Sequence, residues 1–435
     1  MLLRLSVSNY LSLLDEQELS LVAGKLKAPA DALRFPVGDL TILPAALIYG
    51  PNASGKSNLI AALAFMRSAV LHSHTRGDPS GGVPRLPFAF DPEAAERPSM
   101  LEADFTVGDV RYQYGFEAID DRFTSEWLYA YPEGKRRRFY ERTNNNIVFG
   151  PSMRGQKKLL AELMRPNSLF LSTATQNDHE ELSIVRKFFA DMTINQSIWV
   201  GDNIVNSAFS DSDIDDRTIT FLGEIGTGVA GYRRNASEIS DVSRAMLADL
   251  GAVMRKHIAD RGGANIEIDA GPDKHISIEL AHQSRSGTLC YLDLDRESAG
   301  TRRLLLLINT AFRALDSGSL LVIDEVDASL HTRAAEAILA LFDDPERNRL
   351  GAQLIATAHD TNLLASPFLS RDQIWFTEKN QAGETDLFSL AEVRTRPTDN
   401  FELGYLQGRY GGTIAAPRRH RHQRAVIDDE LETSN

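Results

Sequence analysis

The chain has 435 residues, 43% of them hydrophobic, so it is long enough for two or three domains with packed cores. Its formal net charge of −13 argues against a general nucleic-acid coat, because non-specific DNA binding depends on neutralising phosphates. A single cysteine, Cys290, excludes an internal disulfide framework and fits a reducing compartment. We expect Cys290 to be a small buried hydrophobe.

The chain also lacks the features of a secreted or membrane-spanning protein. Residues 1–4 lead into an alternating pattern instead of a long apolar core, so we expect no signal peptide. No apolar run approaches the ~20 residues needed to cross a bilayer. The sequence therefore predicts a soluble, cytoplasmic protein with no membrane partner.

The first 21 residues predict two paired strands. Leu3, Leu5 and Val7 alternate with polar residues, and Leu19 and Leu21 do so again. This period of two is typical of an antiparallel pair with one buried face.

A glycine-rich loop follows these strands and fits the pattern G-x-x-x-x-G-K-[ST] at every fixed position. An apolar run over 41–49 predicts a buried strand before it, and 58–66 predict an apolar-faced helix after it. Strand, glycine loop and helix together predict a phosphate cradle, because backbone N–H groups and the helix N-terminus face the phosphates. Lys56 would reach the β- and γ-phosphates of ATP, and the Ser57 hydroxyl would bind Mg²⁺. The predicted ATP-binding residues are Gly50, Pro51, Asn52, Ala53, Ser54, Gly55, Lys56, Ser57 and Asn58.

The pattern after the first helix divides the rest of the chain. Short strands over 100–107 and 110–116 flank Gly108-Asp109 and predict a hairpin. Helical periods dominate 151–262, at 157–163, 180–189 and 239–257, and strands return at 266–268 and 276–280. We therefore predict an N-terminal half (1–150), a projecting, mainly helical insertion (151–262), a C-terminal half (263–412) and a disordered charged tail (413–435).

Two clusters of basic residues stand out against the acidic composition. They are 135–138, which we expect at a hairpin tip, and 418–424 in the tail. Each cluster is explained by a run of solvated charges, although a local surface that binds nucleic acid is a second interpretation of both.

The segment Leu320–Glu325 is an apolar strand that ends in two acids. Asp324 would bind Mg²⁺, directly or through water, and Glu325 is the natural general base for an attacking water. A second apolar strand ends at His359, from which a side chain can reach a γ-phosphate. The alternative for His359 is a core or capping histidine.

Ser298 and Gly300 precede a predicted helix over 302–315. A serine and a glycine at a helix N-terminus can form an anion site, although an ordinary N-cap explains the serine equally. Read in order, the chain has a P-loop, a long intervening region, Ser-x-Gly before a helix, an Asp-Glu strand, the segment 327–331 and a strand ending in histidine.

This order resembles the ABC-type ATPases. The resemblance implies head-to-tail association, in which Ser298 and Gly300 of one subunit would act in trans on ATP held by another. It also makes Asp327 part of a loop that couples the two sites. One departure is that Ala299 and Thr301 stand where those enzymes have glycine and glutamine. The glutamine with which ABC enzymes sense Mg²⁺ has no assignable counterpart.

Further motifs narrow the resemblance to one family. They are 3–12 (LRLSVSNYLS), 47–57 (LIYGPNASGKS), 112–116 (YQYGF), 126–129 (EWLY) and 400–411 (NFELGYLQGRYG). Over about 1–412 the chain resembles the prokaryotic AAA15/RloA-AbiLi family, relatives of the OLD-family ATPase domain. The resemblance implies phage defence beside a separately encoded effector, with a phage-derived trigger.

Some relatives of that family carry a C-terminal Toprim nuclease domain. The chain after His359 is too short for one and contains no Glu…Asp-x-Asp metal pattern, so we expect no nuclease activity. The motif at 400–412 indicates either close backbone packing or a docking turn for a partner.

Three other functions compete with a defence ATPase. A DNA-repair or SMC-RecF-like ATPase that clamps DNA would need a basic track, which the net charge disfavours, and a long coiled coil. A transporter subunit would have a shorter interval between Ser57 and Ser298. An inactive scaffold would not need Lys56 and Glu325.

Overall fold

The computed structural model describes residues 1–24, 32–75, 78, 80–151, 153–195, 213–238, 274–394 and 399–411. The predicted helix at 239–257, the predicted strand at 266–268 and the tail at 413–435 lie outside these residues. No helix in the described ranges is both long and apolar enough to span a bilayer.

A six-stranded sheet forms the centre of the protein, in the order β11-β15-β16-β5-β17-β18. All neighbours run parallel except β17 and β18, which form an antiparallel hairpin. Its strands are β5 (Ala45–Tyr49), β11 (Thr193–Asn195), β15 (Leu320–Ile323), β16 (Gln353–Thr357), β17 (Ile374–Lys379) and β18 (Thr385–Ser389). Because β5, β15 and β16 are parallel, their carboxyl ends meet at one edge of the sheet.

Alternate residues of the central strands enter two different cores. In β5, Ala46 and Ile48 face one hydrophobic cluster, whereas Leu47 and Tyr49 face the other. The continuous apolar runs seen in the sequence are therefore typical of a parallel sheet that is covered on both faces. The predicted strand at 41–49 is in fact two strands, because the chain turns at Pro44. Residues before it form β4 (Leu40–Ile42), which pairs with β3 (Phe35–Val37).

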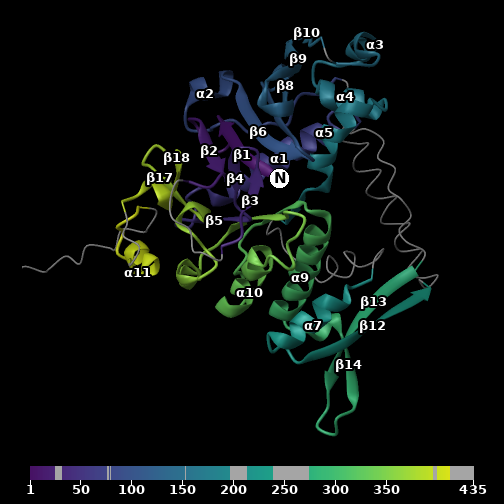
Figure 1. The fold of residues 1–435 in the computed structure, drawn as a ribbon, viewed down its shortest axis with the longest axis vertical. Coiled ribbons are helices and arrows are strands. Elements are labelled where there is room, and N and C mark those ends of the chain that lie inside the picture. Colours follow the sequence, from purple (N-terminus) through teal and green to yellow (C-terminus); the bar gives the residue numbers. More distant parts are fainter. Residues whose placement is uncertain are drawn as a thin grey trace, which may run out of the picture.

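A seven-stranded antiparallel sheet packs above the central sheet (Figure 1). Its order is β10-β9-β8-β7-β6-β1-β2, so the two predicted N-terminal strands do pair but belong to this second sheet. Its strands are β1 (Leu2–Ser8), β2 (Gln17–Ser20), β6 (Ser99–Val107), β7 (Val110–Ala118), β8 (Phe123–Tyr131), β9 (Arg137–Thr143) and β10 (Asn146–Phe149). The predicted hairpin at Gly108-Asp109 is confirmed by the pairing of Val107 with Val110. The expectation that 135–138 lie at a hairpin tip is met in part: Lys135 and Arg136 lie in the connection between β8 and β9, whereas Arg137 and Arg138 begin β9.

Helices cover both faces of the central sheet. On one face lies α1 (Lys56–His72), against which α4 (Phe170–Gln176) and α5 (Glu180–Asp191) pack, whereas α3 (Lys157–Glu162) packs on α4 beside the antiparallel sheet (Figure 1). On the other lie α7 (Asp216–Glu224), α9 (Ala299–Ser317) and α10 (Thr332–Asp343). The short helices α2 (Pro92–Glu96) and α11 (Phe401–Leu406) lie at the periphery.

Part of the predicted insertion lies within the N-terminal body. Helices α3 to α5 contribute to the same hydrophobic core as α1, and β11 adds an edge strand to the central sheet. The segment 157–195 therefore does not project, because its apolar helix faces are buried against α1 and the antiparallel sheet. The remaining domain boundaries stay predictions.

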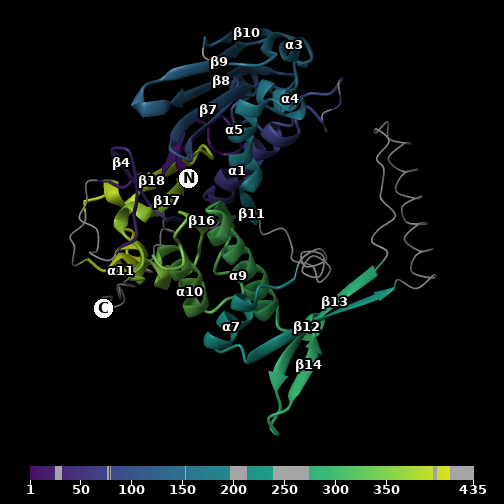
Figure 2. The same cartoon turned by 45° about the vertical axis from the view of Figure 1, so that its right-hand side comes forward.

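A three-stranded antiparallel sheet extends away from this body in both views (Figures 1 and 2). It consists of β12 (Val229–Glu238), β13 (Lys274–Gln283) and the edge strand β14 (Leu289–Asp293). Cys290 lies in β14 and is exposed, so the expectation that it is buried is wrong. The reason is that β14 lies at the edge of a projecting sheet, where the described residues cover little of it.

Candidate functional site: a P-loop and an acidic strand end

The P-loop begins directly after β5 and leads into α1. Gly55 has a φ of 109°, in the region that favours glycine, and a Cβ there would overlap the side chain of Thr385. A Cβ on Gly50 would likewise collide with Thr377. Both glycines are therefore required by close packing of the loop against β17 and β18, which the sequence pattern alone did not show.

Lys56 is buried at the start of α1 and stabilises the loop. Its Nζ donates to the carbonyl of Gly50 at 2.7 Å and to that of Pro51 at 3.1 Å. Burial lowers the pKa of Lys56, and the carboxylates of Asp324 and Glu325 partly oppose this shift. An ammonium carries three donors, so one stays available for a phosphate oxygen.

Ser57 and Asp324 meet although they are 267 residues apart in sequence. The Ser57 hydroxyl donates to Asp324 Oδ1 at 3.2 Å, and the Thr357 hydroxyl donates to the same oxygen at 2.6 Å. A hydroxyl and a carboxylate side by side at a helix N-terminus are the oxygen donors that Mg²⁺ prefers beside phosphates. The residues present therefore fit the predicted magnesium site.

Glu325 and His359 face each other across the carboxyl ends of β15 and β16. Their side chains are 40% and 37% exposed, and His359 Nε2 lies 3.6 Å from Glu325 Oε1. The Glu325 backbone has a φ of 54°, unusual for a residue with a side chain, and its N–H donates to Thr357 Oγ1 at 2.7 Å. The solvent-open carboxylate is placed where a water could be deprotonated.

Asp327 holds the segment that carries His359. Its Oδ2 accepts the backbone N–H groups of His359 at 2.9 Å and of Asp360 at 2.5 Å. The carboxylate thereby fixes the turn after β16. The structure thus brings together Lys56, Ser57, Asp324, Glu325, Asp327 and His359, all of which were predicted site residues.

Ser298 and Gly300 have local structural roles at the start of α9. Ser298 is the N-cap, and its Oγ accepts the N–H of Thr301 at 3.0 Å. A Cβ on Gly300 would come within 2.8 Å of the carbonyl of Ser329, so glycine lets the loop after β15 pass over the helix. The capping explanation is therefore observed, and action in trans stays a prediction.

Three residues of the site were missed by the sequence analysis. Thr357 joins Asp324 to Glu325, and the Arg303 guanidinium donates to the carbonyl of Glu325 at 2.6 Å. His282 on β13 lies 2.7 Å from the carboxylate of Glu297, just before the Ser298 cap. Thr357 ends β16 two residues before His359, and this position was the signal that could have pointed to it.

The glutamine with which ABC enzymes sense Mg²⁺ stays without an assigned counterpart. Strand β11 pairs with β15 and ends at Asn195, whose carbonyl accepts the N–H of Asp324 at 2.9 Å. A strand of three residues gives too weak a periodicity to be predicted from sequence. The residues that follow Asn195 lie outside the described ranges.

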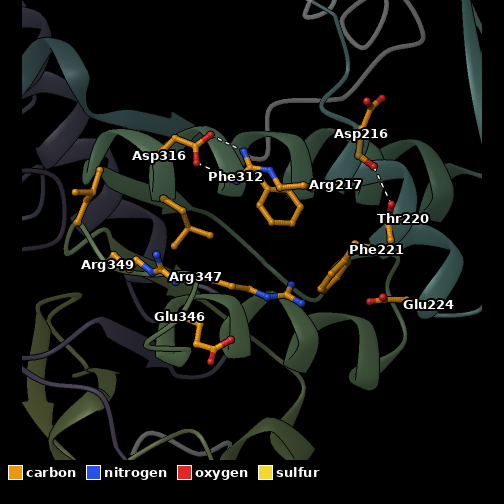
Figure 3. Close-up of a pocket in the computed structure, with 12 residues that line it drawn as sticks. Asp216, Arg217, Thr220, Phe221, Glu224, Phe312, Asp316, Glu346, Arg347 and Arg349 are labelled. Atoms are coloured by element: carbon orange, nitrogen blue, oxygen red, sulfur yellow. Dashed lines mark hydrogen bonds and ion pairs between the residues drawn. The ribbon is translucent and has the colours of Figure 1, made fainter.

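A cavity of about 690 Å³ lies elsewhere, between α7, α9 and the segment after α10 (Figure 3). Arg217 stacks over Phe312 at 4.7 Å and forms ion pairs with Asp215 and Asp316. The rest of the cavity wall combines acidic residues with Arg347 and Arg349. None of the predicted site residues lines it, and its balanced charges favour no single class of ligand.

The matched sequence family spans most of the chain and contains the whole site. A family described as "AAA domain, putative AbiEii toxin, Type IV TA system" matches residues 45–365. The chain belongs to this family. The assignment implies a nucleotide-binding ATPase, and it agrees with the predicted α/β, ABC-type P-loop fold with a mixed central sheet and an antiparallel β-subdomain. The narrower resemblance to the AAA15/RloA-AbiLi group stays a prediction.

Other comparisons are more distant. A structure titled "Crystal structure of the SmcHead bound to the C-winged helix domain of ScpA" shares 13% identity at a TM-score of 0.41, covering 89% of this chain and 97% of that one. An Smc head with an extended coiled coil, bound to the C-terminal domain of ScpA derived from Pyrococcus furiosus, shares 12% identity at a TM-score of 0.38, covering 89% and 96%. No curated protein matches the sequence.

Thr357→Val tests the junction between Asp324 and Glu325. Valine keeps the shape but leaves the Glu325 N–H and one acceptor direction of Asp324 unpaired, which costs ~1–3 kcal/mol. We expect a lower melting temperature and a higher Mg²⁺ requirement for ATP turnover. The matched control is Thr310→Val, because the Thr310 hydroxyl donates only to Leu306 O within α9. Equal effects of the two changes on the Mg²⁺ requirement would contradict the assignment.

Proposed function

We propose that this chain is an Mg²⁺-dependent ATPase that hydrolyses ATP to ADP and phosphate. The observation that carries the proposal is the meeting of Ser57, Asp324, Glu325 and His359 at one edge of the parallel sheet. Lys56 and the N-terminus of α1 would bind the phosphates. Ser57 and Asp324 would hold Mg²⁺, which neutralises phosphate charge when bound.

Glu325 is the proposed general base. Its carboxylate would accept a proton from the attacking water, and His359 would orient the γ-phosphate from the neighbouring strand end. The backbone of Glu325 is held by Thr357 and Arg303 on opposite sides. Fixing the main chain in this way places the carboxylate without rearrangement during the reaction.

Assembly is the proposed consequence of ATP binding. In this proposal, Ser298 and Gly300 of one subunit close over the nucleotide held by a second copy, head to tail. The position of Gly300 against Ser329 supports a link between this contact and the loop that carries Asp327. The assembled form would act on a separately encoded effector in a prokaryotic abortive-infection system. The description of the matched family, which names a toxin, supports this role.

Glu325→Gln is the test of the base and of assembly. Glutamine cannot accept the proton, so we expect ATP binding with turnover reduced by at least ~100-fold. The variant should grow from a smaller to a larger mass on addition of ATP and Mg²⁺, measured by light scattering. Retained turnover would show that Glu325 is not the base, and a mass unaffected by ATP would contradict nucleotide-driven assembly.

Mixing two inactive variants tests action in trans. Lys56→Ala should abolish tight ATP binding, and Ser298→Arg should block closure over a neighbour's nucleotide. A mixed assembly contains one composite site with both an intact P-loop and an intact Ser298, so we expect part of the ATPase rate to return. The measurement is the rate as a function of mixing ratio. No recovery at any ratio would count against a site shared between subunits.

Protection of cells tests the defence role. The chain should be expressed together with its neighbouring genes, and phage plating efficiency should be compared with that of the Lys56→Ala version. We expect protection to depend on Lys56, with Lys157→Ala as a control because Lys157 lies outside the site. ATP hydrolysis without protection against any tested phage would favour the DNA-binding alternative, which a salt-dependent DNA-binding assay would then examine.

A further inference from the structure

Two buried threonines of the β17–β18 hairpin hold carbonyl oxygens of the phosphate loop. Thr377 on β17 donates its hydroxyl to the carbonyl of Tyr49 at 3.2 Å. Thr385, the first residue of β18, donates to the carbonyl of Ser54 at 2.8 Å. Each threonine is 1% exposed, so bulk water does not compete for these hydrogen bonds. The side of the loop that faces the hairpin is therefore fastened by hydroxyl groups.

The direction of each hydrogen bond follows from the single proton that a hydroxyl carries. Thr385 gives its proton to the Ser54 carbonyl, so in the 2.7 Å contact between Thr385 and Ser12 the Ser12 hydroxyl is the donor. Ser12 Oγ in turn accepts from Asn58 Nδ2, which lies 2.6 Å away. The result is a series of hydrogen bonds that runs in one direction from Asn58 to the Ser54 carbonyl, and in such a series each bond strengthens the next.

The side chain of Ser54 is fastened by the same rule. Its hydroxyl lies 2.5 Å from that of Thr377, and the Thr377 proton goes to the Tyr49 carbonyl, so Ser54 is the donor of this contact. Ser54 is itself buried. The hydroxyl protons around Ser54 are thus used within the protein, which leaves the backbone N–H groups of the loop to face a phosphate.

A strained turn presents Ser12 to the hairpin. Asn9 has a φ of 49° and Leu11 one of 52°, in the left-handed region that a residue with a side chain rarely adopts. The Asn9 amide holds the turn from its other side, because it donates to backbone carbonyls in the segment 94–98. The Ser12 carbonyl accepts the N–H of Thr385 at 2.8 Å. Strain of this kind persists only where the surroundings enforce it, and here it brings Ser12 to Thr385.

The motif at 400–411 supports the same hairpin. Tyr405 on α11 stacks on Phe376 of β17 with ring centroids 5.2 Å apart, and Tyr410 stacks on the same ring at 6.2 Å. Phe376 directly precedes the threonine of β17 that holds the loop. A Cβ on Gly404 would overlap the Tyr410 ring, so the glycine allows this close approach. Close packing is therefore the observed role of the motif.

The hold on the Ser54 carbonyl also orients the next N–H group. In a trans peptide the C=O and the N–H of one unit point in opposite directions. Because the Ser54 carbonyl faces Thr385, the N–H of Gly55 points away from the hairpin. Gly55 is the N-cap of α1, so this N–H lies beside the free N–H groups of the first helical turn. Donors of this kind form the anion site of a helix N-terminus.

We propose that Thr385 is a positioning residue for nucleotide binding, and that Ser12 and Asn58 act through it. By holding the Ser54 carbonyl, Thr385 keeps the Gly55 N–H turned toward the phosphates before a nucleotide arrives. The proposal rests on the proposed ATPase function, and it adds β18 and the N-terminal turn to the elements that set the affinity for phosphate groups. Because the hydroxyl acts on the loop and not on the reacting atoms, its loss weakens binding and leaves the hydrolysis of bound ATP unchanged.

Thr385→Val tests this role, because valine keeps the shape of the side chain and removes only the hydroxyl. With Mg²⁺ present, Kd is measured by isothermal titration calorimetry for ADP and for inorganic pyrophosphate. We expect both Kd values to rise by about fivefold to tenfold, the loss typical of one hydrogen bond, while kcat at saturating ATP stays within about twofold. Thr385→Ser retains the hydroxyl and should restore most of the affinity.

Ser389→Ala is the matched control. Ser389 is a buried hydroxyl of the same strand, but its partners are the backbones of Ile374 and Ala391 and not the P-loop. It should lower the melting temperature without changing either Kd. Unchanged affinities in Thr385→Val, an equal loss in the control, or a loss for ADP without one for pyrophosphate would overturn the proposal. A chain that binds neither ligand would refute the proposed function itself, so the two failures are distinguishable.

A cycle of variants tests whether Ser12 acts through Thr385. Pyrophosphate affinities are measured for Ser12→Ala, Thr385→Val and the double variant, each first shown to be folded by its melting transition. Thr385 keeps its bond to the Ser54 carbonyl in Ser12→Ala, so we expect a smaller loss than in Thr385→Val. The double variant should bind as Thr385→Val does, because the two groups belong to one series. Losses that multiply would overturn the role assigned to Ser12.

Discussion

The carboxylate of Asp324 is the point on which the rest of the site depends. One of its oxygens accepts hydroxyls from Ser57 on α1 and from Thr357 on β16, and so three segments far apart in sequence meet there. Thr357 then accepts the N–H of Glu325, whose side chain faces His359. Because a buried carboxylate without donors is expensive, these hydrogen bonds fix the start of α1 against the ends of β15 and β16.

Residues of α9 contact the backbone next to Asp324 and Glu325. Arg303 of α9 donates to the backbone of Glu325, and Gly300 packs under the carbonyl of Ser329. A movement of α9 would therefore reach the acids directly. Asp327 in turn fixes the segment after β16, because its carboxylate accepts the backbone N–H groups of His359 and Asp360. Tyr405 and Tyr410 of the C-terminal motif belong to the same hydrophobic core as α9, so both elements lie on one face of the central sheet.

The sequence predicted most of the site because its chemistry lies in short, continuous motifs. The P-loop and the strand ending in Asp324 and Glu325 each require particular residues at fixed spacing, and both lie where they were expected. Other expectations failed where burial depends on distant segments. Cys290 is exposed because its strand lies at the edge of a projecting sheet, and helices α3 to α5 pack into the body because their apolar faces match α1.

The sequence by itself determined the ABC-type P-loop fold class and located the glycine loop and the acidic strand end, because local patterns of glycine, lysine and carboxylate mark them. Only the tertiary structure decided what holds those residues. Thr357 and Arg303 act through hydrogen bonds between segments tens of residues apart, and no local pattern specifies such contacts. The same holds for Gly404, whose need for a bare backbone follows from the Tyr410 ring that packs against it.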